Sequence, residues 1–309
     1  MRFHHALLLV MAADCAAALP GLNREAEKHL LILNTKKAVV GISPRLAGRV
    51  AVFRAPGGAN VLAENPKMWS PDAKLPGLEA SWDYPGIQGH VIWTGPQREW
   101  WLHQDISREW RENGYGWPPD PWAEFAPYDV VKRTLVSAVL RGPASPVTGL
   151  RLTKEVSIGP DGRVRLKTMA ENVRDRDVTW DLWSNTRLPG TADAYVPVMD
   201  TIRIEHESPA DGNQAALGYE VLGGFFRFAT GEPIPPGKSC RVAKAFLSPK
   251  TGFIAAFSAG QVFVKRFNPA PRGAVHPDQG VVEIYHHLDR EPANSLLELE
   301  FHGALKKLK

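Results

Sequence analysis

Short runs in which apolar and polar residues alternate recur along most of this chain, and the clearest lie in residues 149–173. One set of alternate positions is apolar and the other is polar or charged: Leu150, Leu152, Val156 and Ile158 against Arg151, Thr153, Glu155 and Ser157. The sequence Gly-Pro-Asp-Gly at 159–162 is typical of a tight turn. A period of two places one face of a strand on a core and the other in water, so a β-hairpin is predicted here.

The same kind of run returns many times and is separated by Gly, Pro, Asn and Asp. The runs are 37–42, 49–54, 60–63, 90–93, 130–140, 178–188, 201–207, 240–247, 261–267, 281–288 and 295–302. Helical periodicity is scarce outside a short candidate at 23–31. Many short strands with turns between them favour a sandwich or a barrel. We therefore expect an all-β fold, a large antiparallel β-sandwich that occupies residues 37–309.

Eight of the ten tryptophans fall between Trp69 and Trp122, inside a segment, 64–127, that has few strand signals. An indole is a flat apolar plate with one N–H, so it either fills a core or forms a recognition surface. Charged side chains stand between these rings, and such a mixture suits a sugar, which has apolar C–H patches and many hydroxyls. We expect a functional insert with a carbohydrate ligand. The alternative is that the rings only fasten a long loop.

The N-terminus has the pattern of an export signal. An apolar run reaches Leu19, and Ala16-Ala17-Ala18 offers small residues for cleavage. Residues 1–18 are therefore predicted to be a signal peptide and 19–36 a lead-in to the domain, which predicts a periplasmic or secreted protein. The run is too short for a stable membrane span. Asp14, rather than a small residue, precedes Cys15, and this disfavours lipidation.

Charge, cysteine and histidine usage narrow the function classes further. The formal net charge of +4 comes from scattered Lys and Arg, so no nucleic-acid partner is expected. Cys240 is the only cysteine beyond the predicted signal, which leaves no internal disulfide. His286 and His287 are adjacent and would point to opposite faces of a strand, so no metal site is predicted. No motif indicates a cofactor, and nothing in the sequence fixes an oligomeric state.

Three stretches together resemble the galactose-mutarotase-like fold of the aldose 1-epimerase superfamily, and they look most like its mutarotase-like branch in exported bacterial proteins. They are VVGISPRLAGRVAVFRAPGGANVLAENP at 39–66, GHVIWTGPQREWW at 89–101, and the hairpin with its following strand at 149–189. The resemblance covers most of the chain after residue 37. It implies a large β-sandwich, the galactose-mutarotase-like supersandwich, whose concave face binds carbohydrate.

The departures from this family concern the catalytic residues. The resemblance implies a general-acid histidine on the strand at 178–189, and this chain has none there. It also implies a general-base glutamate late in the chain, for which Glu283, Glu298 and Glu300 are candidates. From the residues alone, His90 or His103 could supply the acid and Glu283 or Glu99 the base. We assign His90 and Glu283 as the catalytic candidates and expect no ordinary mutarotase activity.

The sequence thus predicts a carbohydrate-binding, mutarotase-like protein of the cell envelope. Its predicted substrate-binding residues are Trp93, Arg98, Trp101, Trp183 and Arg187. One alternative is an active aldose epimerase, or another carbohydrate-active enzyme, with a displaced general acid. A second is a structural envelope protein that uses the sandwich as a scaffold.

Overall fold

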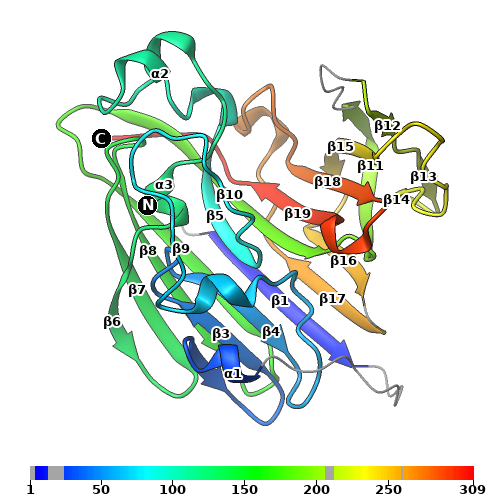
Figure 1. The fold of residues 1–309 in the computed structure, drawn as a ribbon, viewed down its shortest axis with the longest axis horizontal. Helices are drawn as coiled ribbons and strands as arrows, with labels where there is room; N and C mark the ends of the chain where they lie inside the picture. The colour runs from blue at the N-terminus through cyan, green and yellow to red at the C-terminus, as the bar shows by residue number, and fades with distance from the viewer. Residues whose placement is uncertain (1–3, 13–23, 206–211, 259) are drawn as a thin grey trace.

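The computed structural model describes residues 4–12, 24–205, 212–258 and 260–309 (Figure 1). Strands dominate these residues, and the longest helix in them has six residues. Two large sheets share the long strand β11 (Asp193–Glu205). Almost all of the strand pairs are antiparallel; in the described chain the exception is β12 (Gln214–Ala216), which runs parallel to β15 (Cys240–Pro249). The predicted all-β, antiparallel sandwich is confirmed.

The first sheet begins at an edge strand and ends on β11. Its order is β6 (Asp129–Arg133), β7 (Ser137–Ala144), β8 (Leu150–Ile158), β9 (Val164–Asn172), β1 (His4–Ala12), β17 (Gln261–Arg266), β16 (Phe253–Ser258) and the start of β11. All five side chains of β6 are exposed, and its register against β7 shifts between Val130 and Lys132.

The second sheet carries the candidate site. Its order is β2 (Leu31–Asn34), β3 (Val39–Ser43), β4 (Arg49–Arg54), β5 (His90–Gly95), β10 (Val178–Pro189), β19 (Leu296–His302), β18 (Val282–Asp289), β15 and the end of β11. Three further short strands pair at the margins: β14 (Phe225–Phe228) pairs with β11, β13 (Tyr219–Leu222) pairs with β14, and β20 (Lys306–Leu308) pairs with β10.

The core lies between the facing sides of the two sheets. Val40 and Ile42 of the second sheet and Val156 and Phe263 of the first belong to one buried cluster. The predicted hairpin is β8 and β9, and burial along β8 alternates residue by residue as the period of two requires. Lys154 occupies a buried position in that alternation, and its Nζ donates to the carbonyl oxygen of Ala47 at 2.7 Å. A buried ammonium without such an acceptor would be strongly unfavourable.

The N-terminal residues enter the first sheet. β1 lies between β9 and β17 and pairs antiparallel with both. It occupies part of the predicted signal peptide, and residues 1–3 and 13–18 of that segment lie outside the described residues. The signal peptide therefore stays a prediction. In the predicted lead-in, β2 already pairs with β3, so the second sheet begins at Leu31 rather than at residue 37.

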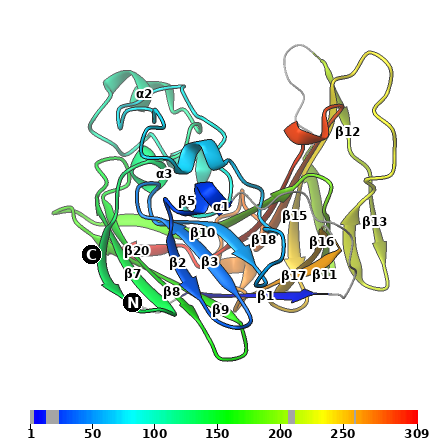
Figure 2. The same cartoon turned by 60° about the horizontal axis from the view of Figure 1, so that its bottom comes forward.

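The Trp-rich segment is mostly irregular apart from β5 and short helices. Figures 1 and 2 show it gathered with α2 over one end of the sheets. The helices of the described chain are α1 (Arg24–Glu27), η1 (Pro66–Trp69), η2 (Gln97–Glu99), α2 (Arg108–Asn113), α3 (Pro121–Glu124), η3 (Arg272–Ala274) and η4 (Pro292–Asn294). None of them has the length and apolar character needed to cross a bilayer.

Candidate functional site

A cavity of about 460 Å³ lies where the Trp-rich segment meets β15 and β18. We call it the tryptophan cavity. Its aromatic lining residues are Trp82, Tyr115, Trp117 and Phe246, and its charged and amide lining residues are Gln97, Arg98, Glu205, Lys244, Asp278, Gln279 and Glu283. Ligand sites combine apolar walls with a few polar groups in this way.

Two tryptophans stand exposed at this cavity. Trp82 is 58% exposed and Trp117 is 38% exposed, whereas the other eight, all of them in the described chain, are buried or half-buried. The Trp82 ring is held by Trp110 and Tyr115, with ring centroids 4.9 and 4.8 Å away. Trp110 is fixed in turn by α2, whose N-cap Ser107 accepts a hydrogen bond from the Trp110 backbone N–H. The helix thus supports an indole face that remains open to solvent.

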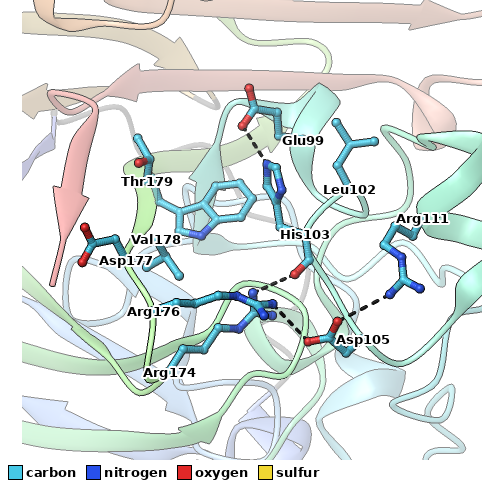
Figure 3. Close-up of a pocket in the computed structure, with 11 residues that line it drawn as sticks. Glu99, Leu102, His103, Asp105, Arg111, Arg174, Arg176, Asp177, Val178 and Thr179 are labelled. Carbon is cyan, nitrogen blue, oxygen red and sulfur yellow. Dashed lines mark hydrogen bonds and ion pairs between the residues drawn. The ribbon is translucent and has the colours of Figure 1, made fainter.

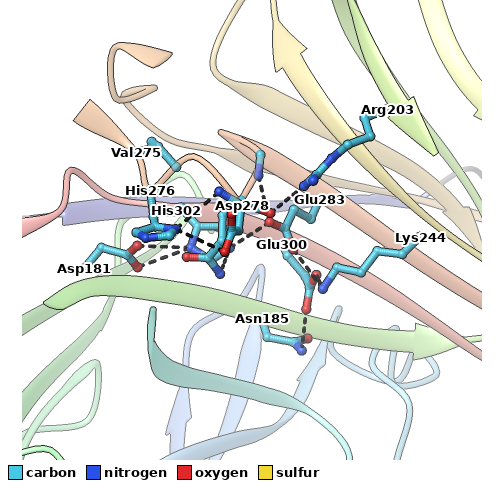
Figure 4. Close-up of polar contacts among 12 residues, drawn as sticks. Asp181, Asn185, Arg203, Lys244, Val275, His276, Asp278, Glu283, Glu300 and His302 are labelled. Carbon is cyan, nitrogen blue, oxygen red and sulfur yellow. Dashed lines mark hydrogen bonds and ion pairs between the residues drawn. The ribbon is translucent and has the colours of Figure 1, made fainter. Parts of the chain in front are cut away.

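The base of the cavity is a buried cluster of charged groups around Lys244 (Figure 4). The Lys244 ammonium lies 2.8 Å from Glu283 Oε2 and 3.0 Å from Glu300 Oε2. Glu283 and Glu300 are direct neighbours across β18 and β19, so their carboxylates share one face of the sheet. Two buried like charges repel each other, and the ammonium between them offsets that repulsion. The Trp183 ring lies under this ammonium, 4.7 Å from it.

His302 extends this cluster away from the cavity. Its Nδ1 lies 3.2 Å from Asp181 Oδ1 and its Nε2 lies 3.3 Å from Glu283 Oε1. The strand register explains the contact between His302 and Asp181. His302, at the end of β19, is paired with Trp183 of β10, two residues from Asp181. The backbone N–H of Gly280 donates to the same Glu283 oxygen at 2.8 Å. His302 and Glu283 are almost wholly buried.

The protonation states of the cluster follow from these contacts. Burial lowers the pKa of His302, but the charges of Asp181 and Glu283 outweigh it and raise that pKa to about 9. Burial likewise raises the pKa of Glu283, but Lys244 and His302 outweigh it and lower that pKa to about 2. At neutral pH the two residues are therefore an imidazolium and a carboxylate. Burial, with Glu298 and Glu283 nearby, raises the pKa of Glu300 to about 7.

This arrangement suits fixed hydrogen bonding better than acid–base catalysis. An aldose ring that opens and closes needs an acid and a base on separate atoms of one sugar. Here His302 and Glu283 contact each other at 3.3 Å, which leaves no space for a sugar between them. Lys244, Gln279 and Glu283 instead line the cavity with hydrogen-bonding groups, and the Lys244 ammonium is held in place by Glu283 and Glu300.

Two of the predicted site residues line the tryptophan cavity. Glu283 lies at its base, and Arg98 lies at its rim, where the guanidinium is 2.6 Å from Asp278 and 3.3 Å from His276 Nε2. Trp183 lies just beneath the cavity, 1% exposed, between Lys244 and His302. Its ring supports the charged cluster and has no open face.

The other three predicted binding residues are structural. Trp101 is fully buried and donates to the carbonyl of Pro118 at 2.7 Å. Trp93 donates to the buried carboxylate of Glu124. Arg187 is 4% exposed, and its Nε lies 2.6 Å from Glu298. Trp93 lies on β5 and Arg187 on β10, both inside the second sheet, and Trp101 follows β5 in the Trp-rich segment. None of the three lines the tryptophan cavity.

His90 does not face Glu283. It is 4% exposed, and its Nδ1 bonds the hydroxyl of Thr186 at 2.8 Å. Successive side chains of a strand point to opposite faces, and Trp93, an odd number of residues away on β5, contacts Trp183 beneath the cavity. His90 therefore lies on the other face of the second sheet, among Lys154 and Lys265, whose charges together with burial lower its pKa. The predicted pairing of His90 with Glu283 does not occur.

Sequence reasoning missed Lys244, Gln279 and His302 as site residues. Lys244 lies in an otherwise strand-like run, and His302 ends one, and neither has a local motif. The one available signal is the repetition of glutamate on the last two strands, at 283, 298 and 300. In the described residues no group of three or more His, Cys, Asp and Glu is placed to hold a metal ion.

Comparison with known proteins gives a family and distant structural likenesses. A family model described as "Domain of unknown function (DUF4380)" matches residues 29–309. A search of curated proteins gave no match. Several solved structures are similar to this chain. Three of them have TM-scores below 0.5, and these likenesses support no argument about activity.

The first is a TPR-domain containing protein from Parabacteroides distasonis ATCC 8503, with a TM-score of 0.49, 13% identity, and coverage of 89% of this chain and 45% of that one. The second is a 4-alpha-glucanotransferase from Thermococcus litoralis, with a TM-score of 0.30, 10% identity, and coverage of 88% and 37%. The third is a candidate aldose 1-epimerase from Escherichia coli K12, with a TM-score of 0.35, 12% identity, and coverage of 90% and 99%. This chain thus spans less than half of the first two.

Proposed function

The chain belongs to the DUF4380 family, and from that premise we propose that it is a mutarotase-like carbohydrate-binding protein of the cell envelope. Its ligand occupies the tryptophan cavity. The protein holds the sugar without catalysing ordinary mutarotation.

The observation that carries this proposal is the placement of the two exposed tryptophans. Trp82 and Trp117 both border the same cavity, while the remaining tryptophans are covered to different degrees. Exposed indoles cost free energy in water, and a patch of them beside polar groups is typical of a ligand site. The open ring faces would stack on the C–H faces of a sugar.

The polar residues of the cavity supply the second requirement of sugar recognition. Lys244 offers an ammonium, Glu283 a carboxylate and Gln279 an amide, and all three lie at the base of the cavity. Sugar hydroxyls both donate and accept hydrogen bonds, so this mixed set matches them. Because ion pairs already fix Lys244 and Glu283, little conformational entropy of these two side chains is lost on binding.

Trp82→Ala tests the binding proposal. Wild-type protein is screened by thermal shift against monosaccharides and envelope polysaccharides, and hits are titrated by calorimetry. Loss of the indole is expected to cost about 1–3 kcal/mol, or roughly 5- to 150-fold in affinity. Phe257→Ala is the matched control, since Phe257 is an aromatic residue, 51% exposed, that does not line the cavity. Equal affinity in wild type and Trp82→Ala would remove this cavity as the site.

Polarimetry tests the absence of mutarotation. Fresh α-glucose or α-galactose should change rotation at about the rate seen without protein, because the ion pair of His302 and Glu283 occupies the space that an acid and a base across a sugar would need. A rate like that of a working mutarotase, lost in Glu283→Gln, would instead make the protein an epimerase.

A further inference from the structure

A second hollow, of about 680 Å³, lies against the same Trp-rich segment (Figure 3). We call it the arginine hollow, because Arg111, Arg174 and Arg176 line it together with His103 and Trp180. The two hollows meet at η2. Arg98 lines the tryptophan cavity, and the next residue, Glu99, lines the arginine hollow.

Arg174 is fixed by three backbone carbonyl oxygens. Arg111, which donates to the carbonyl oxygen of Gln104 at 2.8 Å, and Arg176 keep exposed side chains. Arg174 donates to the backbone carbonyl oxygens of His103, Pro146 and Val147 at 2.7, 2.7 and 3.1 Å. Arg111 and Arg176 come from different segments, and their guanidinium groups meet at a single carboxylate, that of Asp105, at 3.4 and 3.1 Å. Their side chains are 40% and 56% exposed.

Positive charge therefore exceeds the negative charge available to it in this hollow. Asp105 alone faces two guanidinium groups. The remaining carboxylates of the lining have other partners, Asp177 with Lys307 at 2.8 Å and Glu99 with His103 at 3.2 Å. The pKa of Arg174 is lowered by burial and by the like charge of Arg176. That repulsion would be relieved by an anion.

We propose that the arginine hollow binds the carboxylate or sulfate groups of an acidic glycan, a neighbouring unit of which occupies the tryptophan cavity. The inference rests on the proposed function and names the ligand class. A guanidinium fork matches the two oxygens of a carboxylate or sulfate. The cavity and the hollow are lined by consecutive residues, Arg98 and Glu99, so a chain of linked sugars can reach both.

The experiment compares ligands of equal length with and without charge. Calorimetry is performed on wild type with tetragalacturonate, with a sulfated heparin tetrasaccharide and with the uncharged galactotetraose. Arg176→Ala is expected to weaken the preferred acidic ligand about tenfold and to leave galactotetraose unchanged. The preferred acidic ligand distinguishes carboxylate from sulfate recognition.

A variant that gains affinity makes the test stricter. Asp105→Asn removes the carboxylate that competes for Arg111 and Arg176, so acidic ligands are expected to bind several-fold more tightly. The matched controls are Arg163→Ala and Asp161→Asn, which make the same charge changes at the turn between β8 and β9. That turn is at the far end of nine-residue strands from Arg174, roughly 30 Å away.

The outcomes separate the two proposals. If galactotetraose binds as well as both acidic ligands, or if Arg176→Ala acts no more strongly than Arg163→Ala, the acidic-glycan inference is wrong and carbohydrate binding stands. If no glycan binds in any arm, the proposed function fails and the inference fails with it. A preference for an acidic ligand that Arg176→Ala removes and Asp105→Asn increases supports both.

Discussion

At the scale of single residues, the main feature is a set of buried charges that depend on one another. Lys244 lies between Glu283 and Glu300, and Glu283 also contacts His302. Removing one member of a buried ion pair leaves the other without compensation, which is more costly than the pair itself is stabilising. The cluster therefore fixes the base of the tryptophan cavity, and changes within it affect folding as well as binding.

The titration of His302 gives a prediction on stability. Its pKa is raised from 6.5 to about 9 in the folded protein, because Asp181 and Glu283 outweigh burial. The folded protein thus keeps a proton that the unfolded chain loses, and this stabilisation is complete below pH 6.5 and is lost as pH rises to 9. Buried Lys154, whose pKa is lowered to about 7, and buried Lys265 contribute in the opposite direction over the same window. Urea unfolding at pH 7 and pH 9 should therefore show the contribution of His302 as a difference between wild type and a His302 variant.

The comparison of two histidine variants isolates the contribution of His302 in that measurement. Glu300, whose pKa is raised from 4.5 to about 7, alters stability mainly below pH 7, outside the window. His302→Gln should make the change in the free energy of unfolding between pH 7 and 9 more positive than in wild type, whereas His29→Gln, at an exposed histidine, should leave it as in wild type. An unchanged slope in His302→Gln would show that His302 is not charged in the folded protein.

At the scale of elements, four adjacent strands create the candidate site. β10 supplies Asp181 and Trp183, β19 supplies His302 and Glu300, β18 supplies Glu283, and β15 supplies Lys244. A shift of one residue in any of these registers would send the side chains to the opposite face. The site is thus a property of strand pairing more than of any one segment.

The position of strand β1 in the first sheet conflicts with the predicted removal of the signal peptide. Residues 4–12 pair with β9 and β17, and they also carry the apolar run of the predicted signal peptide. We predict that the mature chain begins near Leu19, so that the exported protein lacks β1. Mass spectrometry of natively expressed protein should then give a mass without residues 1–18. An intact Met1 on the abundant form would instead make β1 a permanent strand of the first sheet.

At the scale of the whole molecule, local patterns predicted the architecture well. The hairpin at 150–172 and the strands at 178–189, 240–249 and 282–289 each fulfil a periodicity that is visible in a few consecutive residues. The six-residue helix α2 was not predicted, because its apolar residue, Trp110, is a single ring in a charged stretch.

The site could be predicted only in part, because it depends on contacts between distant residues. Glu283 and Arg98 were assigned from the sequence and line the cavity. Asp181 and His302 are separated by 121 positions and meet only through sheet pairing. The solvent exposure of a side chain also depends on residues that are distant in the sequence. Trp82 and Trp101 lie in the same Trp-rich segment, yet Trp82 is exposed to solvent and Trp101 is buried.

The free edge of the first sheet has a consequence for the protein at high concentration. β6 presents backbone groups that no strand of the described chain pairs on its outer side, and such an edge can template stacking of one molecule on another. The irregularity at Val130–Lys132 bends that edge, and Lys132 and Arg133 place like charges along it. Two copies approaching edge to edge would meet with mismatched hydrogen bonds and mutual repulsion, so β6 is built to resist fibril growth.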